Sequence, residues 1–500
     1  MSMSNSLPTD IRIGVNRPHP LTVVVMVIAF QIFGVVLLAY AGLTPIGHWQ
    51  DEFAILPLTM QGIKPALMRL VTWSPRPVSE ALIYVYGHLV NHFRAPLIGS
   101  SLLFLWGLLG ACMVAVPFAM RKHLPSGTSL VQCFAIACAT YCLFLLGHPV
   151  SEMFYWPLAA FAYLPTLGAI SVAMWAMVII GTESRAGRWT CAIALIVAAW
   201  SAEVGAMLVF VFCGLTIGYA VVARLAKRDF GMPRPVDCWI AAPLLASAAV
   251  LVILRLVRVG NPNEIFGDSK IAHHLGPALE LAVYHFIDEV VAPIAIVESL
   301  DARLMAGATK LAFVLGIYGI LRPIFAKVNL GRAVPLLLVF GIACVATVFL
   351  TTAAAYYEFG LVCCERHETF RLSLIYVGLA SVAAFAASIR MRVKTAAPYG
   401  APWYVALLAA AVLIQAYGAA PAVISDYQKF DEYFRIKNAN WAAGTSPAES
   451  MVFLQKERGQ VIGGLVQPEA THTFTSNSGW WIESILTFFG KKSLTFQTEK

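Results

Sequence analysis

An adjacent pair of carboxylates, Asp51 and Glu52, is the first place in the chain where chemistry could be done. A carboxylate that is partly buried has a raised pKa and can then serve as a general base. Arg76 follows in the same stretch between two apolar segments and adds a positive charge. The alternative interpretation is that Asp51 and Glu52 only end a helix in water.

The segment from Arg76 to Phe93 has the spacing of an amphipathic helix. One side carries the apolar residues Val78, Leu82, Val85, Leu89 and Phe93. Another side carries the polar residues Glu80, Tyr84, His88 and His92. We therefore predict an interfacial helix whose polar stripe, with Glu80 and His88, could line a binding site. The stripe could equally be a solvated face. It also permits metal binding, although His88 and His92 lack a supporting metal motif.

Two later carboxylates stand beside long apolar stretches. Glu152 opens an aromatic-rich segment that includes Tyr163, and such aromatics are also typical of an ordinary interfacial belt. Glu203 interrupts an otherwise apolar stretch, and an acidic residue so placed is functional by default. Both carboxylates are therefore candidates for binding a polar substrate.

A cationic cluster, Arg366, His367 and Arg371, stands at the start of another apolar segment. Because guanidinium groups match the oxygens of phosphate, the two arginines could clamp a phosphate group. The alternative is local pairing of these arginines with Glu365 and Glu368.

The elements that must position these residues are membrane helices. The 500 residues are 59% hydrophobic and only 12% charged, whereas a soluble domain has about 25% charged residues. We predict an all-α, polytopic transmembrane helical bundle that crosses the bilayer about eleven times, with interfacial helices in the first external loop. The predicted spans are 21–43, 96–120, 127–147, 156–181, 189–201, 204–223, 238–257, 308–325, 333–355, 372–389 and 401–420. The regions 189–223, where Trp200 to Glu203 resembles a turn, and 278–307 are the ambiguous ones.

The orientation follows from the lysines and arginines, which occupy every second loop. By the positive-inside rule these loops are cytoplasmic. We therefore expect a cytoplasmic N-terminal tail (1–20), a transmembrane domain (21–420) and a short external C-terminal tail (421–500) in the inner (plasma) membrane. The candidate carboxylates then all face outward. The net charge of +8 is spread over short loops, which is a mark of topology, and we expect no nucleic-acid partner.

Taken together, Asp51-Glu52 after the first helix, the interfacial segment from Arg76 to Phe93, and the run from Glu152 through Trp156 to Tyr163 resemble the GT-C superfamily of polytopic glycosyltransferases. The bacterial O-antigen glucosyltransferase type is the nearest resemblance. The pattern covers most of residues 20–390 by topology but only a few short motifs. The C-terminal tail has no counterpart in it.

The resemblance implies transfer of a sugar from a polyprenyl-phosphate donor to a glycan or lipid acceptor on the outer (periplasmic) face, with inversion at the anomeric carbon. Asp51 would be the base, or Glu52, since the motif here is Asp-Glu preceded by Gln50. Glu152 and Glu203 would orient hydroxyl groups. Arg366, Arg371 and Arg76 would neutralise the departing phosphate. No cofactor is implied, and dependence on a divalent metal is left open.

Three other classes remain alternatives. A transporter or flippase would place ionisable residues deep in several spans, whereas most charges here stand at span ends. A membrane acyltransferase would use a helix-borne histidine, for which His148 and His367 are candidates. The third alternative is a non-catalytic assembly protein or receptor.

Overall fold

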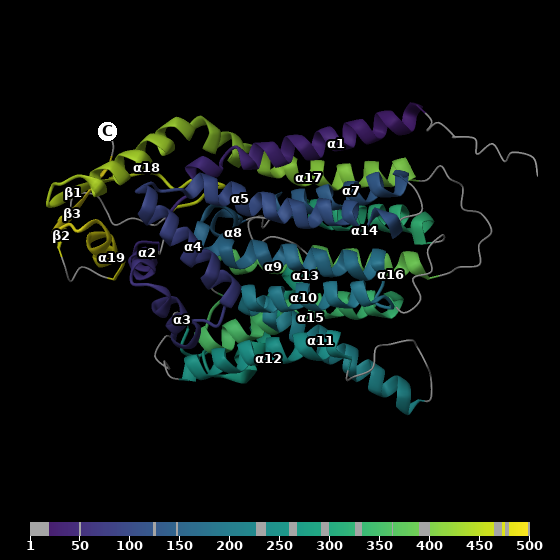
Figure 1. The fold of residues 1–500 in the computed structure, drawn as a ribbon. Coiled ribbons are helices and arrows are strands. Elements are labelled where there is room, and N and C mark those ends of the chain that lie inside the picture. Colours follow the sequence, from purple (N-terminus) through teal and green to yellow (C-terminus); the bar gives the residue numbers. More distant parts are fainter. Residues whose placement is uncertain are drawn as a thin grey trace, which may run out of the picture.

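The computed structural model describes residues 20–49, 52–123, 127–146, 149–226, 237–259, 268–291, 300–325, 333–362, 364–389, 401–464, 473–475 and 480–498. Long helices run side by side and form one bundle (Figure 1). They are α1 (Pro20–Ala41), α5 (Ile98–Gly110), α7 (Gly127–Leu146), α9 (Pro157–Trp175), α10 (Arg185–Ser201), α11 (Glu203–Leu225), α12 (Cys238–Val259), α14 (Leu300–Phe325), α15 (Ala333–Phe359), α16 (Glu365–Ser388) and α17 (Ala401–Gln428). A π-helical turn (Ala111–Ala115) and α6 (Val116–Ala119) continue α5, and a π-helical turn (Ala176–Ile180) continues α9.

Every predicted apolar segment coincides with one of these helices. Among the described residues, 9 helices are long and apolar enough to cross a membrane. The prediction of a mostly helical, multi-pass membrane protein is thus confirmed. α7 contributes a shorter apolar stretch, Leu130–Leu146, and α10 has 17 residues. The count of 11 spans therefore stays a prediction.

The position of each helix in the bundle follows from which of its sides are apolar. α9 and α16 are apolar all round and lie at the centre, where 78% and 72% of their most apolar windows are buried. α1 and α12 are as apolar but lie at the periphery, with Leu38 73% and Leu245 70% exposed. Apolar side chains that are not covered by protein face lipid in a membrane. Hydropathy alone does not separate these two cases.

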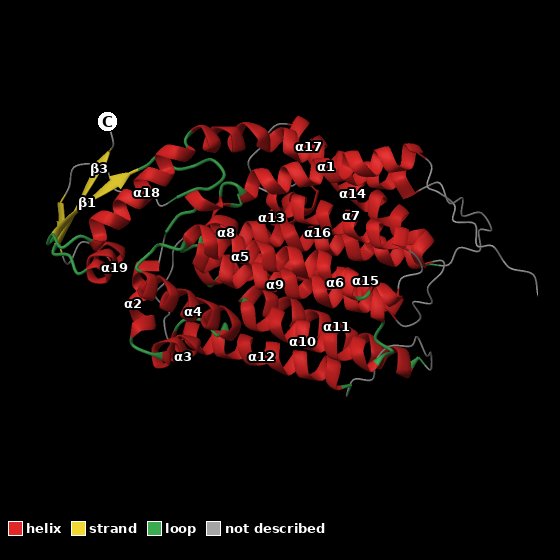
Figure 2. Cartoon of the chain, turned by 45° about the horizontal axis from the view of Figure 1, so that its top comes forward, coloured by secondary structure: helices red, strands yellow, loops and turns green. Residues whose placement is uncertain are grey.

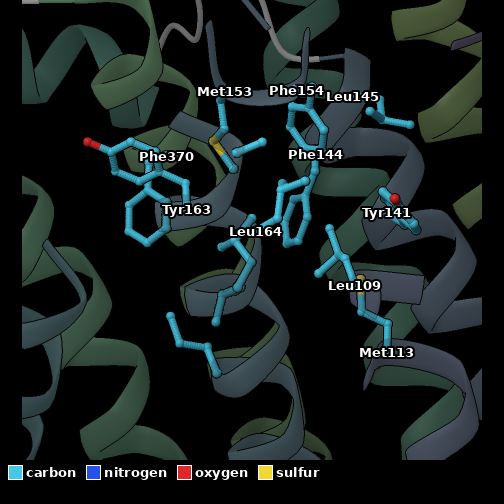
Figure 3. Close-up of a cluster of buried hydrophobic side chains, with 14 of the residues drawn as sticks. Leu109, Met113, Tyr141, Phe144, Leu145, Met153, Phe154, Tyr163, Leu164 and Phe370 are labelled. Carbon is cyan, nitrogen blue, oxygen red and sulfur yellow. The ribbon is translucent and has the colours of Figure 1, made fainter. Parts of the chain in front are cut away.

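Beside the first turns of α9 and α16 the core is rich in aromatic rings (Figure 3). Tyr163 of α9 packs on Phe370 of α16 with ring centroids 5.4 Å apart. Met153 and Phe154, from the short helix α8 (Ser151–Tyr155), and Phe144 of α7 complete the cluster in the close-up. The cluster fixes the relative positions of the segments that begin at residues 151, 157 and 365.

One end of the bundle carries the short elements, and we call it the capped end. Here lie α2 (Glu52–Met60), α3 (Ile63–Thr72), α4 (Pro77–Phe93), α18 (Phe430–Thr445) and α19 (Trp480–Phe489) (Figure 1). A three-stranded sheet has the order β1-β3-β2, with β1 (Ser450–Gln455) parallel and β2 (Thr473–Thr475) antiparallel to β3 (Ser493–Thr498). The predicted C-terminal tail thus includes the end of α17 and a small unit made of α18, the loop 456–464, α19 and the sheet, which we call the C-terminal unit (Figure 2).

The predicted interfacial helix is α4, which has an exposed apolar side, a side with the polar stripe, and a buried side. Val85 and Phe93 of the apolar side are exposed, and so are His88 and His92 of the polar stripe. The third side is buried and consists of Ser79, Ile83, Tyr86, Gly87 and Val90. Gly87 is needed for this contact, because a Cβ there would come within 2.4 Å of the Thr59 side chain on α2.

The two ambiguous regions are also described in part. Residues 185–225 form two helices, because the chain breaks at Ala202 in extended conformation (φ −151°, ψ 153°). The region 278–307 contains α13 (Leu275–Val291), which packs along α15, and the start of α14. Exposed apolar side chains at Leu275, Val283 and Ile287 line one side of α13.

Candidate functional site

A continuous set of polar contacts at the capped end joins segments that are far apart in the sequence. Its first part is formed by Ser74, Arg76 and Glu203. Glu203 is the first residue of α11, where the positive end of the helix dipole favours a carboxylate. Ser74 donates a hydrogen bond to Glu203 Oε1, and Arg76 Nε lies 3.6 Å from the same oxygen. Because the chain breaks at Ala202, α11 begins at Glu203, within reach of Ser74 and Arg76.

The pair is largely shielded from solvent, since the Arg76 and Glu203 side chains are only 17% and 23% exposed. Tyr163 is buried next to it, and its ring centroid lies 5.9 Å from that of His367. The structure therefore brings the predicted residues Arg76, Tyr163, Glu203 and His367 together.

The second part is an ion pair between Glu152 and Arg366, with Nη1 and Oε2 2.8 Å apart. The guanidinium carbon of Arg366 also lies 5.2 Å from the centre of the Trp156 ring, at cation–π distance. The Trp156 indole N–H is buried and has no hydrogen-bond partner within the described chain. A buried donor of this kind is costly unless a ligand satisfies it. Arg366 thus pairs with Glu152, which lies 214 residues away in the sequence, and the expected alternative of pairing with a neighbouring glutamate does not hold for it.

The third part is contributed by the C-terminal unit. Glu365 accepts a hydrogen bond from Ser151 and forms an ion pair with Arg458. Gly463, with φ +64°, passes so close that a Cβ would lie 2.5 Å from the Ser151 Cβ and 3.8 Å from His48 Cε1. The loop 456–464 thus lies directly over α8 and the residues that follow α1.

Asp426, at the end of α17, fixes this loop. Its carboxylate is fully buried and accepts hydrogen bonds from three successive backbone N–H groups, those of Gln460, Val461 and Ile462 (2.7, 2.8 and 2.9 Å). Such a concave row of N–H groups is a typical anion-binding geometry. Here the anion is a side chain of the bundle, so that the loop and α17 are held together.

Lys456, the first residue of this loop, lies near a second lysine, Lys437, and near His48. His48 is only 5% exposed, and burial together with the charge of Lys456 lowers its pKa to about 3, so that the ring is neutral near pH 7. Burial also lowers the pKa of Lys456 to about 8, and burial and the charge of Lys456 lower that of Lys437 to about 8. His48, Lys437, Lys456 and Arg458 are not among the residues predicted from the sequence. The group Lys456-Glu457-Arg458 at the end of a strand was the available signal.

Other predicted residues lie outside this set of contacts. Asp51 falls outside the described residues. Glu52 is fully buried in the first turn of α2, and its charge acts on Tyr86 of α4. Glu80 is also buried, and Arg69 binds both its oxygens at 2.9 and 3.2 Å. His88 is exposed beside Tyr84.

Arg371 belongs to a separate cluster between α13, α14 and α16. It is 2% exposed and donates from Nε to Glu289 Oε1 at 2.7 Å. His285 lies 3.1 Å from the same oxygen, and Lys310 donates to the carbonyl oxygens of Glu289 and Val290. Burial opposes the ionisation of Glu289, but the contacts with His285 and Arg371 outweigh it and lower its pKa.

Within the part of the chain that the structure describes, no three His, Cys, Asp or Glu side chains are grouped so that they could hold a metal ion. No family model, no curated protein and no solved structure matches the chain.

Proposed function

We propose that this protein is a membrane glycosyltransferase that moves a sugar from a polyprenyl-phosphate donor to an envelope glycan or lipid acceptor. The observation that carries the proposal is that the ion pairs Arg76–Glu203 and Glu152–Arg366 lie at one end of a membrane bundle, where Tyr163 interacts with both arginines. Partly buried carboxylates can bind sugar hydroxyls, and arginines can bind a phosphate. The segment with Asp51 and Glu52 starts from His48, which borders this set of contacts.

In the proposed reaction Asp51 takes the proton from the acceptor hydroxyl. The hydroxyl oxygen then forms a bond to the anomeric carbon as the bond from that carbon to the phosphate oxygen breaks. The phosphate leaves with the electron pair, and Arg76 and Arg366 stabilise its charge. Glu152 and Glu203 orient the hydroxyl groups of the two substrates, and this positioning lowers the barrier of a two-substrate reaction. Arg371 has no part in this step, because it lies in the separate buried cluster with Glu289 and His285.

The test compares envelope glycans and glycolipids by mass spectrometry in the native host with the wild type, a deletion and Asp51→Asn. Asp431→Asn, an exposed site on α18, is the matched control, and membrane levels are equalised. We expect a mass of one sugar residue to disappear with the deletion and with Asp51→Asn and to persist with Asp431→Asn. A deletion that changes no glycan would refute sugar transfer. Full activity of Asp51→Asn would refute the assigned base and move it to Glu52 or to another residue.

Transport of a lipid-linked or anionic substrate is a second candidate function, because Arg371 and Lys310 are ionisable residues within apolar helices. Buried charges in membrane helices often mark a transport pathway. A flippase and a transferase differ in one measurement. Purified protein in vesicles would translocate a fluorescent prenyl-phosphate sugar without forming a new glycosidic bond in the first case, and would form the bond in the second.

A further inference from the structure

We propose that Lys437 and Lys456 of the C-terminal unit, together with His48, form a binding site for the phosphate headgroup of a membrane lipid. The inference rests on the proposed function only for the identity of the lipid as a polyprenyl phosphate. The binding of phosphate is argued from the contacts below. The site adds cationic groups to Arg76 and Arg366 for the lipid phosphate, in place of Arg371, and it makes the C-terminal unit part of the substrate site.

The two lysines are both partly buried, and their charges act on each other. Lys437 donates to the carbonyl oxygen of Pro45 and lies 5.2 Å from the Phe434 ring centre. The Lys456 ammonium lies 4.6 Å from the centre of the Tyr433 ring. Among the described residues it has no hydrogen bond and no ion pair. Each lysine keeps donors for a ligand, since an ammonium has three.

The charge balance of this place calls for an anion. The positive charge of Lys456 acts on both Lys437 and His48, and Arg458 also acts on His48. Asp426 is the carboxylate that acts on Lys456, and Arg458 is paired with Glu365, so the two lysines share one negative charge and keep an excess positive charge. Bringing two ammonium groups together out of water is unfavourable unless an anion compensates them.

His48 is an independent sign of a ligand. Its ring is 5% exposed and bonds to the backbone at Ile462, but Nδ1 has no hydrogen-bond partner in the described chain. A neutral imidazole carries one proton on its two nitrogens and can donate to, or accept from, a phosphate hydroxyl or oxygen. The ring lies next to Gly463, and Lys456 Cε lies 3.6 Å from where a Cβ of Gly464 would be. The two glycines thus let the backbone pass close to both the histidine and the lysine.

The aromatic residues that lead to the lysines argue for a lipid. Tyr427, Phe430 and Phe434 stack in sequence from the end of α17 into α18, with centroids 6.3 and 6.2 Å apart. Tyr427 and Phe434 are each 41% exposed. Exposed aromatics at the end of a membrane helix mark the level of the lipid headgroups. Lys437, one turn beyond Phe434, therefore stands at the height of a lipid phosphate.

The experiment measures binding of radiolabelled farnesyl monophosphate to the full-length protein in nanodiscs of neutral lipid, with farnesol and inorganic phosphate as competitors. We expect Lys437→Met and Lys456→Met each to raise the Kd at least about tenfold. Lys456→Arg, which keeps the charge, is expected to stay within about threefold of the wild type. Lys492→Met is the control, because Lys492 lies in the same unit but is 74% exposed and pairs with Glu449.

Displacement by unlabelled farnesyl phosphate but not by farnesol supports the lipid phosphate site. Equal displacement by inorganic phosphate would assign the site to the free anion and overturn its assignment to a lipid. Equal displacement by farnesol, or wild-type affinity of both methionine variants with unchanged thermal stability, would overturn the site itself. Because no sugar transfer is measured, loss of this site and failure of the proposed reaction are separate results.

Discussion

Replacing His48 by glutamine should make the stability of the protein less sensitive to acid. The folded protein holds the His48 ring neutral, with a pKa of about 3, whereas an unfolded histidine has a pKa of about 6.5. The unfolded state therefore binds more protons than the folded state between these two values. The stability contributed by the neutral ring is present above pH 6.5 and is lost as the pH falls toward 3.

The magnitude follows from the two pKa values. Protonation of the unfolded state alone lowers the free energy of unfolding by about 2 kcal/mol between pH 8 and pH 5. Between pH 8 and pH 5 the free energy of unfolding should therefore fall by about 2 kcal/mol more in the wild type than in His48→Gln, because the other titrating groups are the same in both proteins. Glutamine does not titrate in this range. A constant difference in the free energy of unfolding between the two proteins does not matter, because only the change with pH is compared.

The assay is unfolding in mixed detergent micelles at pH 8, 7, 6 and 5, with His92→Gln as control because His92 is exposed on α4. We expect the curve of His92→Gln to run parallel to that of the wild type and the curve of His48→Gln to be flatter. Parallel curves for His48→Gln and the wild type would show that the ring is solvated and titrates normally. The buried position of His48 next to the loop 456–464 would then be refuted.

Two further predictions concern the charged clusters. Because both lysines have a pKa of about 8, the affinity for farnesyl phosphate should fall by about tenfold for each required lysine between pH 7 and pH 9. The variant Lys456→Arg should lose affinity in only one such step. An unchanged Kd up to pH 10 would contradict the lowered pKa values of the lysines. Arg371→Met should lower the free energy of unfolding by about 3–5 kcal/mol, because it leaves Glu289 buried without its arginine. The control Arg188→Met, on the exposed side of α10, should change the free energy of unfolding by less than about 0.5 kcal/mol. A similarly small loss for both variants would refute the buried pair.

Much of the helical architecture could be predicted from the sequence, because a membrane span needs a long apolar run and the chain has few other ways to satisfy its backbone in lipid. The turn expected at 200–203, in a region where one long helix was the alternative, corresponds to the break at Ala202. It could not assign the buried side of α4, because Val85 and Phe93 are apolar yet exposed, while Ser79 and Gly87 are small and buried. In a membrane, apolar character marks both the core and the lipid-facing surface.

The candidate site was predictable in its residue types but not in its pairings. Arg366 has glutamates beside it in the sequence but pairs with Glu152, because the break between α8 and α9 and the start of α16 meet in space. Arg371 stands one and a half turns further along α16 and therefore points into a different cluster, with Glu289. The C-terminal unit resembled no family, so that Lys437, Lys456 and Arg458 carried no signal until the fold placed them beside His48.

Because Asp426 at the end of α17 holds the loop 456–464 by three hydrogen bonds, the length of α17 determines where this loop lies. Each residue added to a helix turns everything beyond it by about 100° and moves it by about 1.5 Å. A single insertion between Tyr417 and Asp426 would therefore turn Asp426 and the loop that it holds, with Lys456 and Arg458, away from Ser151, His48 and Glu365. The number of residues in the last turns of α17 is thus a fixed quantity in this chain, although the lipid-facing side chains along the same turns, such as Tyr417 and Ile424, are open to change in type.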